Sequence, residues 1–600
     1  MSDVRARFQR AVDEHLAAPL EAALADWALR HDGDPAVAVA LASCSRAVAD
    51  GHSCLALDRD LPAIPGEQPF CGREPLDAAL AASQLVGAPG ESRPLVLDAS
   101  RLYLHRYWAY ETALAERLRE LLGDPPNDVD TRMLAPDGGL FAYDWVAEGE
   151  THWQAVAAFV ALRHRFAVIS GGPGTGKTYT VLRLMRLLVE SALGAGRPAP
   201  VIRMAAPTGK AAARMMESTR GGLDAMDMPA GLRGHIPTEA QTLHRLIGLG
   251  MNTTRPRYDR DNPLAADAVI VDEASMVDLP MMAKLVAALP EHARLILLGD
   301  RYQLASVESG SVLAEICNAA GIDAFTPAQQ AAAGPLLRAA MAEGTQPLAD
   351  HVVTLQTSHR FRADSPIGRL AAAVNEGDAD TVLRIAGGSA PAINLIDEVG
   401  AARLDALIDE AARRFGALVK ARDAAEALES LQERCLLCAV RRGPAGSDTV
   451  NRRITERLAV VHGLDPSRRW YHGRPVMVTR NDYRAGLYNG DVGVCLAQDD
   501  GHFRVWFHTE DGVVPFLPSA LPEHETVYAM TVHKSQGSEF RHVTLVLPPE
   551  DSPVLSRELV YTGITRARES VTLFGRQDLL RTAVERHIRR HSGLGERLGR

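Results

Sequence analysis

This sequence contains few lysines, few cysteines and no long apolar run. The 600 residues hold 60 arginines but only five lysines, which are Lys177, Lys210, Lys284, Lys420 and Lys534. An ammonium and a guanidinium do different chemistry, so the few lysines that remain are candidates for specific roles.

Seven cysteines, an odd number spread along the chain, exclude a disulfide framework. Cys435 and Cys438 lie in an apolar run, without a second CxxC pair or a His cluster nearby. We interpret them as part of a buried strand rather than a metal or redox site. No apolar run reaches the roughly 18 residues of a membrane helix, and no signal-peptide core follows the first residues. We therefore expect a soluble, cytoplasmic protein without a membrane partner.

The acidic charge is unevenly distributed. The formal net charge is −10, with 46% hydrophobic and 23% charged residues, as in an ordinary soluble chain of several domains. Residues 1–150 hold 13 arginines, no lysine and 25 acidic residues, a local charge of −12, which leaves +2 on residues 151–600. The first quarter is therefore expected to contact protein rather than DNA, whose binders carry a basic face.

The apolar pattern divides the chain into three parts. Residues 1–125 favour a mostly helical, partner-binding domain, with a short strand at 94–98. The aromatic-rich stretch 102–111 is compatible with helix core or with an interaction surface. Short strands then alternate with helices over 126–345 and again over 346–600, which predicts two α/β domains with parallel sheets.

Within these α/β domains, the expected strands are 166–170, 201–206, 268–272, 294–299, 435–440, 542–547 and 570–575. Turn-rich short strands over about 475–525 predict a small β-barrel-like insert. A polar loop at 248–263 is an ordinary surface loop or a wedge at a duplex junction.

A phosphate-binding loop follows the strand at 166–170 and precedes a helical run. The sequence GGPGTGKT fills the P-loop pattern with Gly171, Gly172, Pro173, Gly174, Thr175, Gly176, Lys177 and Thr178. Backbone N–H groups of such a loop converge on phosphate oxygens. Lys177 is expected to reach the β- and γ-phosphates of ATP, and the Thr178 hydroxyl to bind Mg²⁺.

Catalytic groups are expected farther along the chain. Asp272 and Glu273 end the apolar strand at 268–272. After a P-loop, the first suits Mg²⁺ binding and the second suits activation of the attacking water. Arg360 and Arg566 lie in the second α/β domain, from which an arginine can stabilise the transferring phosphoryl group.

The order of motifs resembles that of superfamily 1 helicases, with two RecA-like motor domains. The matching segments are Gln154, 206–212 (APTGKAA), 241–244 (QTLH), 271–278 (VDEASMVD), 299–304 (GDRYQL), 357–361 (TSHRF), 531–539 (TVHKSQGSE) and 561–568 (YTGITRAR). Residues 298–310 and 528–539 narrow the resemblance to the RecD family, the α subunits of exodeoxyribonuclease V (RecBCD). The insert before 531 resembles the SH3-like insertion of the RecD and Pif1 branch. The resemblance extends from about residue 94 to 590 and is loose before that; Tyr302 stands where the family often has Asp.

This resemblance implies roles for further residues. Gln154 would read adenine, Gln303 would sense the γ-phosphate, and Glu539 would hold the ribose. Contacts to DNA are implied for Pro207, Thr208, Lys210, Thr242, His244, Thr531, His533 and Lys534.

The family also implies an activity: ATP-driven 5′→3′ movement on single-stranded DNA, starting from duplex ends, in double-strand break repair and recombination. The implied partners are RecB-like and RecC-like subunits, one of which would supply the nuclease. The alternatives are a stand-alone RecD-like or Pif1-like helicase, a non-motor scaffold that ATP only switches, and, less favoured, an RNA helicase. The stand-alone class usually has a longer N-terminal extension with helix-hairpin-helix repeats, which this sequence lacks.

Overall fold

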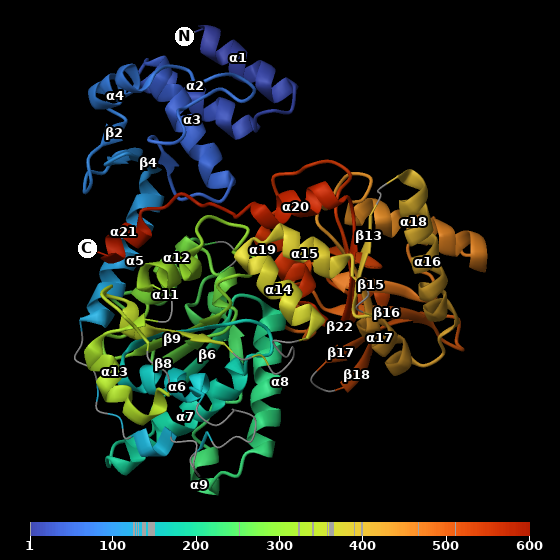
Figure 1. The fold of residues 1–600 in the computed structure, drawn as a ribbon. Coiled ribbons are helices and arrows are strands. Elements are labelled where there is room, and N and C mark those ends of the chain that lie inside the picture. The colour runs from blue at the N-terminus through green and yellow to red at the C-terminus, as the bar shows by residue number, and fades with distance from the viewer. Residues whose placement is uncertain are drawn as a thin grey trace.

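The computed structural model describes residues 2–599 apart from 124–126, 128, 130, 135–139, 142–149, 251–252, 322–323, 339–340, 357, 359–364, 389–390, 398–399, 466 and 510–511. An N-terminal unit lies above two sheet-containing bodies that stand side by side (Figure 1). The chain is therefore an α/β protein with two parallel sheets and a separate N-terminal unit, as predicted.

The N-terminal unit combines helices with a small sheet. Its helices are α1 (Ser2–Asp13), α2 (Pro19–His31), α3 (Pro35–Ala49) and α4 (Arg73–Ala82). Its sheet has the order β1 (Leu55–Ala56), β4 (Arg101–Leu104), β3 (Leu95–Asp98) and β2 (Val86–Gly87). β3 confirms the strand expected at 94–98. The aromatic-rich stretch is only partly helical, because its first residues form β4.

α5 (His105–Leu122) leaves this unit and packs against the first large sheet. Tyr107, Leu114 and Leu118 share one buried cluster with β5, β8 and β9. The helix therefore belongs to the core of the first body, although the sequence placed it in the N-terminal domain.

The first large sheet is entirely parallel. Its order is β12 (Val352–Leu355), β5 (Phe166–Gly171), β9 (Arg294–Gly299), β8 (Ala268–Val271), β6 (Ile202–Ala206) and β7 (Ala240–Thr242). The flanking helices are α6 (Trp153–Arg163), α7 (Lys177–Gly194), α8 (Gly209–Ala225), α9 (Ala230–Arg233), α10 (Leu243–Leu246), α11 (Leu279–Ala287), α12 (Val312–Ala320) and α13 (Pro327–Ala333). β10 (Ala324–Phe325) and β11 (Ala342–Glu343) form a separate pair. Because β12 pairs with β5, this sheet extends past the division expected at residue 345.

The second large sheet is also parallel. Its order is β13 (Ile393–Ile396), β22 (Ala567–Phe574), β21 (Phe540–Val546), β14 (Arg434–Cys438) and β20 (Ala529–Thr531). Its helices are α14 (Pro366–Glu376), α15 (Ala379–Ala386), α16 (Ala401–Lys420), α17 (Ala424–Glu433), α18 (Ser447–His462), α19 (Arg557–Ile564) and α20 (Gln577–Glu585). Cys435 and Cys438 are buried in β14 as free thiols, which confirms their interpretation as strand residues.

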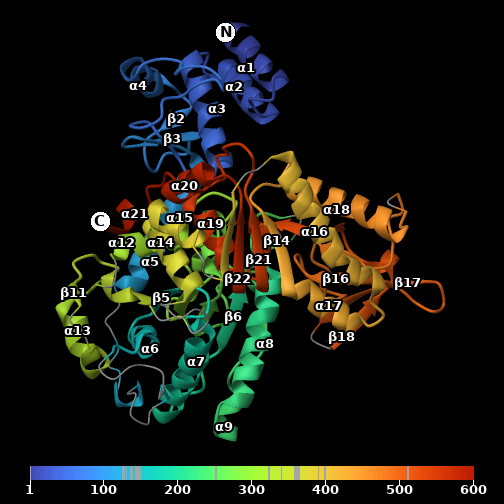
Figure 2. The same ribbon diagram turned by 45° about the vertical axis from the view of Figure 1, so that its right-hand side comes forward.

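A five-stranded antiparallel sheet is inserted before β20. Its order is β18 (Gly512–Phe516), β17 (Phe503–Thr509), β16 (Val492–Ala497), β15 (Arg474–Val478) and β19 (His524–Thr526). Buried Val476, Cys495 and Phe507 form its core. The predicted insert is thus present as a β structure, and its likeness to an SH3 barrel stays a prediction. Figure 2 shows it at the outer side of the second body.

The C-terminal segment returns to the N-terminal unit. α21 (Leu594–Gly599) packs beside α5, where the red and blue ribbons meet in Figures 1 and 2. Glu111 of α5, fully buried, accepts hydrogen bonds from Ser592 Oγ (2.7 Å), the Gly593 backbone N–H (3.1 Å) and Tyr103 Oη (3.0 Å). The chain end thereby fastens the N-terminal unit to the first body.

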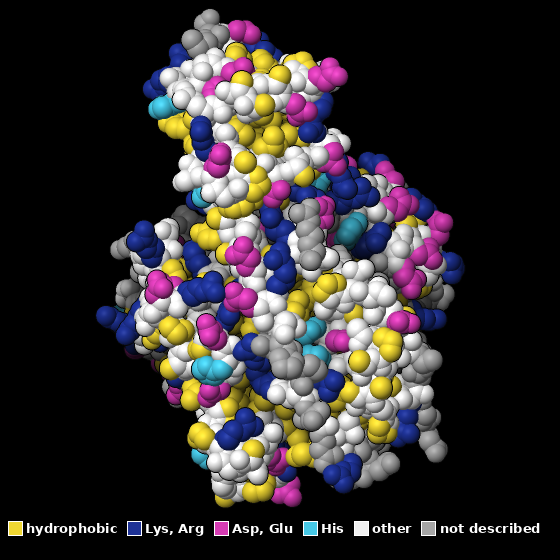
Figure 3. Space-filling model, turned by 90° about the vertical axis from the view of Figure 1, so that its left-hand side faces the viewer, with side chains coloured by type: hydrophobic (Ala, Val, Ile, Leu, Met, Phe, Trp, Pro, Cys, Tyr) yellow, Lys and Arg dark blue, Asp and Glu magenta, His cyan; other side chains and the backbone are white. Residues whose placement is uncertain are grey.

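The surface of the N-terminal unit is mixed rather than uniformly acidic. In Figure 3 its upper lobe shows acidic and basic side chains around a hydrophobic area. Several of its acids are paired, for example Asp26 with Arg5 and Asp77 with Arg73. No helix among the described residues is long and apolar enough to cross a membrane.

Candidate functional site

The P-loop joins a buried strand to a long helix at the centre of the first sheet. β5 is buried along its whole length, and α7 begins at Lys177 directly after the loop. Gly174 (φ 77°) and Gly176 (φ 85°) adopt left-handed conformations that favour glycine. The loop can therefore turn its backbone N–H groups inward, where the α7 N-terminus favours an anion.

The two predicted nucleotide contacts in this region lie against the loop. The Lys177 ammonium donates to the carbonyls of Gly171 (2.6 Å) and Gly172 (3.2 Å). Gln154, buried at the start of α6, donates from Nε2 to the Thr175 carbonyl (3.0 Å). Thr178 is half-buried in the first turn of α7. All of the predicted P-loop residues are thus brought together at one end of β5.

Asp272 and Glu273 follow β8, two strands away from β5. The Glu273 backbone N–H donates to Asp272 Oδ1 (2.8 Å), and Glu273 itself has φ 52°. A left-handed non-glycine residue is strained, and such strain is common at functional sites. Burial first and the Glu273 carboxylate second raise the pKa of Asp272 to about 6, and Lys177 opposes the shift. Asp272, Glu273 and Lys177 therefore form one electrostatic group.

A buried polar cluster connects the two large sheets. Asp300, at the end of β9, accepts hydrogen bonds from Gln303 Nε2 and from the Tyr561 hydroxyl of α19, both at 3.0 Å. Tyr561 also faces the P-loop, because a Cβ atom added at Gly172 would lie 2.9 Å from its hydroxyl. Leu304 N donates to Thr562 Oγ1 (2.9 Å). The P-loop and α19 therefore face each other across the interface between the sheets.

Arg566 lies just after α19 and is buried. It donates from Nε to the Thr562 carbonyl (3.2 Å) and from Nη1 to the Ser538 carbonyl (3.3 Å). Its Nη2 and the Oε1 of Gln303 are buried without a hydrogen-bond partner among the described residues. Burial lowers the pKa of Arg566, whereas Glu273, Glu539 and Asp300 raise it. A buried donor and a buried acceptor are therefore left open at this interface.

Of the two remaining predicted site residues, only Glu539 is among the described residues. Arg360 lies outside the described residues. Glu539 accepts from Arg568 Nη2 (3.0 Å) and lies 3.8 Å from Arg214 Nη1, so its carboxylate is held by two arginines.

The residues predicted to contact DNA follow the carboxyl ends of strands. Pro207 and Thr208 follow β6, Thr242 ends β7, and Thr531 ends β20. Thr208 caps α8 by accepting from Ala211 N, and Thr242 caps α10 by accepting from Arg245 N. Open α/β sheets bind ligands beyond these strand ends.

The histidines and lysines predicted to contact DNA differ in how far they are exposed to solvent. His244 is exposed, whereas His533 is half-buried and burial lowers its pKa. Lys534 pairs with Glu525 (2.7 Å). Lys210 donates to the Gly490 carbonyl (2.9 Å) and to Ser538 Oγ (2.7 Å), and burial lowers its pKa to about 8. Lys210 therefore bridges the first body to both the insert and the second body.

Sequence reasoning missed three groups here. Asp300 and Tyr561 lie inside segments that matched helicase motifs, but no role was assigned to them. Tyr483 lies in a turn of the insert. Its hydroxyl lies 3.5 Å from Thr242 Oγ1, and its ring centroid lies 4.8 Å from the Arg245 guanidinium carbon. An aromatic residue in a turn rich in Asn, Asp and Gly was the available signal.

The class of protein follows from two matched families. Residues 154–309 match the family described as an AAA domain, and residues 526–574 match the UvrD-like helicase C-terminal domain. These ranges contain the P-loop with Asp272 and the segment with Arg566, respectively. The chain is thus a P-loop protein of helicase type with two parallel-sheet bodies.

The particular family follows from full-length relatives. The chain is 39% identical to "RecBCD enzyme subunit RecD" of Mycolicibacterium smegmatis, over 95% of each chain. It is 40% identical to the protein of the same name from Mycobacterium tuberculosis, over 95% of this chain and 92% of that protein. Residues 10–103 match the N-terminal domain of RecBCD enzyme subunit RecD. The chain belongs to the RecD family.

More distant similarities are found as well. The "ATP-dependent RecD2 DNA helicase" of Deinococcus radiodurans is 30% identical over 83% of this chain, which covers 58% of that protein. Among solved structures, Pif1 helicase from Candida albicans shares 15% identity, covers 74% of this chain and 97% of its own, and gives a TM-score of 0.38. Bacteroides Pif1 bound to single-stranded DNA shares 16% identity over 68% and 88%, with a TM-score of 0.33. The family assignment therefore rests on the RecD relatives.

Proposed function

We propose that this chain is the ATP-dependent 5′→3′ DNA helicase subunit of a RecBCD-type complex. The observation that carries the proposal is the open donor on Arg566, buried at the interface between the sheets near Glu273. A buried guanidinium with an unused N–H group fits a negatively charged ligand, because leaving that group without a partner costs free energy. A γ-phosphoryl group held by the P-loop supplies that charge.

The nucleotide site assigns a role to each residue around this interface. The P-loop backbone and Lys177 bind the phosphates, while Thr178 and Asp272 hold Mg²⁺, which neutralises phosphate charge when bound. Glu273 accepts the proton of the attacking water. Gln303, Arg360 and Arg566 contact the γ-phosphate. Gln154 reads adenine and Glu539 holds the ribose.

The DNA strand lies across the carboxyl ends of β6 and β7 in the first sheet and of β20 in the second. The residues that contact the sugar-phosphate backbone of the DNA are Pro207, Thr208, Lys210, Thr242, His244, Thr531, His533 and Lys534. Contacts of this kind suit movement along DNA without sequence preference. The effect of ATP hydrolysis is transmitted to this surface through Gln303. The backbone of the neighbouring residue, Leu304, is hydrogen-bonded to both Thr562 and Gln536 of the second body.

The N-terminal unit is proposed to meet RecB-like and RecC-like subunits in the cytoplasm, and the nuclease belongs to a partner. The matched RecD N-terminal domain supports this division. The proposed division of the chain is 1–125 for partner binding, 126–345 for the first motor domain and 346–600 for the second, except that α5 and β12 pack in the first motor domain. The insert spans about 475–525. The 248–263 loop is proposed to be surface structure.

The test is ATP hydrolysis with and without single-stranded DNA, with Lys177→Gln as the inactive control. We expect DNA to stimulate hydrolysis in the parent chain and not in the variant. Unwinding of duplexes with 5′ or 3′ tails, assayed with the native partners present, then gives the direction. ATP binding without stimulation by DNA would contradict the motor assignment and favour a scaffold that ATP only switches.

A stand-alone helicase is the second candidate, favoured only by the RecD2 similarity. Co-purification separates the two: a monomer that unwinds efficiently and does not bind RecB or RecC would exclude the subunit assignment.

A further inference from the structure

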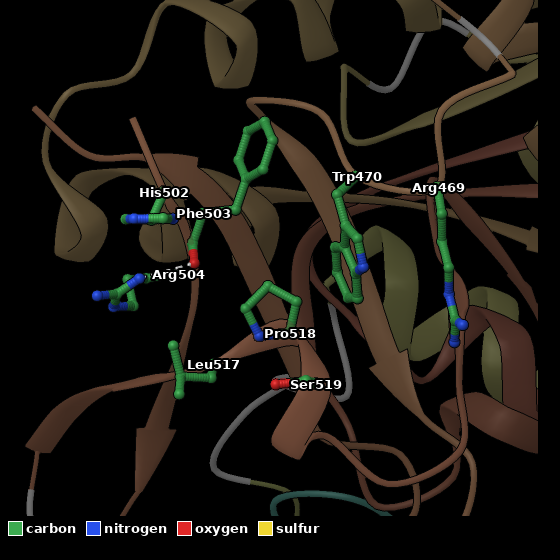
Figure 4. Close-up of a pocket in the computed structure, with 8 residues that line it drawn as sticks. All are labelled: Arg469, Trp470, His502, Phe503, Arg504, Leu517, Pro518 and Ser519. Atoms are coloured by element: carbon green, nitrogen blue, oxygen red, sulfur yellow. Dashed lines mark hydrogen bonds between the residues drawn. The ribbon is translucent and has the colours of Figure 1, made fainter. Parts of the chain in front are cut away.

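A cavity of about 520 Å³ opens at one end of the antiparallel insert. Its lining residues are Arg469, Trp470, His502, Phe503, Arg504, Leu517, Pro518 and Ser519. In Figure 4 the Trp470 indole lies at the centre near Pro518, with Arg469 on one side and His502 and Arg504 on the other. The cavity thus combines an aromatic surface with flanking cations.

The Trp470 ring is held in place by side chains packed around it. The guanidinium of the buried Arg474 lies 4.8 Å from its centroid, and the ring of His524 lies 5.1 Å away. Arg474 donates to Thr526 Oγ1 (3.0 Å) and to the Arg469 carbonyl (2.6 Å). A ring fixed in this way loses little side-chain entropy when a flat ligand stacks on it.

The charge at the cavity is positive. Its lining contains two arginines and a histidine but no acidic side chain. Of the two arginines, Arg504 forms an ion pair with Asp500 at 3.6 Å. Since the charged side chains that line the cavity are cationic, the cavity favours an anionic ligand.

The cavity and the proposed DNA surface lie on opposite faces of the edge strand β19. Lys534 pairs with Glu525 on β19, and the preceding residue, His524, contacts both Trp470 and Arg469 Nη2 (3.2 Å). One edge strand of three residues therefore separates the cavity from the segment that follows β20. A strand of nucleic acid that leaves Lys534 would reach the cavity by turning around this edge.

We propose that the cavity is an accessory subsite for single-stranded nucleic acid, with one base stacked on Trp470 and the adjacent phosphates bound by Arg469 and Arg504. The subsite rests on the proposed function, because it extends the same DNA track. Aromatic stacking combined with cations, without base-edge donors in fixed positions, is typical of sequence-independent single-strand binding. Two cationic side chains beside the ring favour a polyanion over an uncharged proline-rich peptide.

The experiment compares the affinity of the full chain for labelled oligothymidylates of about 8 and about 20 nucleotides, lengths chosen around typical single-strand site sizes. The variants are Trp470→Ala and the double variant Arg469→Ala with Arg504→Ala. We expect each to bind the longer strand about tenfold more weakly, the value of one stacked base or two phosphate contacts. Affinity for the shorter strand is expected to stay within twofold.

Arg452→Ala is the matched control, because Arg452 lies exposed on α18 and pairs with Glu456, away from the cavity. It removes one positive charge and is expected to bind both strands like the parent. The double variant also reduces the dependence of binding on salt by about 1.4 in slope, since each phosphate contact on a single strand contributes about 0.7. The double variant leaves the core of the insert intact, so it still tests the subsite if Trp470→Ala unfolds.

Equal losses on both strands, or none on either, overturn the subsite. If hydrolysis is still stimulated by the shorter strand, the motor assignment stands and only the subsite fails. Tight binding of an oligoproline peptide that Trp470→Ala abolishes, without a length effect on DNA, would instead assign the cavity to a peptide.

Discussion

The hydroxyl of Tyr561 donates a hydrogen bond of 3.0 Å to the buried carboxylate of Asp300, across the interface between the two large sheets. Tyr561 faces the P-loop at Gly172, and Asp300 also binds Gln303, whose Oε1 is left open. One short chain of contacts therefore joins the phosphate loop, Gln303 and the second body. We expect the coupling between ATP binding and the second body to act through these groups.

Tyr561→Phe removes this hydrogen bond while keeping the ring. Hydrogen bonds to charged groups contribute about 1.5–3 kcal/mol, so we expect DNA-stimulated ATP turnover at saturating ATP to fall about tenfold. Tyr302→Phe is the matched control, because its half-buried ring packs edge-on against Tyr561 in the same region. Equal turnover in the two variants would remove Tyr561 from the coupling path.

Glu273→Gln is expected to shift the pH dependence of Mg²⁺-supported nucleotide binding. Asp272 must be ionised to hold the metal, and its pKa is raised to about 6 by burial first and by Glu273 second. Binding is therefore expected to weaken progressively as the pH falls below about 6. Removing the Glu273 charge lets Asp272 ionise more easily, so the midpoint moves to lower pH by up to about one unit.

The measurement is a titration of a fluorescent ATP analogue with Mg²⁺ between about pH 5 and 8, a range set by the raised Asp272 pKa. The phosphates of the nucleotide titrate in the same range, but they do so equally for parent and variant. The difference between the two midpoints therefore reports on Asp272. Identical midpoints would contradict the coupling between the two carboxylates.

The large parallel sheets were predictable because their strands are buried on both faces and read as apolar runs. β5, β8 and β9 lie at the expected positions, and so do Lys177, Asp272 and Glu273 at their ends. β7, with the sequence AQT, has no apolar signal, since it is an edge strand of three residues. β4 was missed because alternating Leu and Tyr precede a helix without a turn residue between them.

Contacts between distant residues could not be predicted. Asp300 and Tyr561 are 261 positions apart, and Glu111 and Ser592 are 481 apart. Nothing in a single sequence states which buried polar groups will meet, since many pairings satisfy the same hydrogen-bonding requirement. The acidic count of residues 1–150 likewise did not predict that one of those acids, Glu111, fastens the C-terminal segment.

Glu111→Gln is expected to loosen the C-terminal segment. Glu111 accepts hydrogen bonds from Tyr103, Ser592 and Gly593, and an amide nitrogen in place of one oxygen would face these donors. The free energy of unfolding is expected to fall by about 2–4 kcal/mol, with faster proteolysis after residue 586. Glu116→Gln is the control, because Glu116 is exposed on the same helix α5. Equal stability of the two variants, measured by urea unfolding, would show that the buried carboxylate does not hold the segment.

Substitutions of Lys534 and of Glu525 are expected to change DNA affinity in opposite directions. Their ion pair of 2.7 Å must open before the ammonium can bind a phosphate. Lys534→Ala is therefore expected to weaken binding of single-stranded DNA severalfold and to reduce the salt slope by about 0.7, whereas Glu525→Gln is expected to strengthen binding. Lys284→Ala is the matched control, since that ammonium lies on α11, 5.8 Å from the Tyr110 ring of α5. Weaker binding in both Lys534→Ala and Glu525→Gln would instead mean that the ion pair is needed to build the site, and that Lys534 does not itself contact the strand.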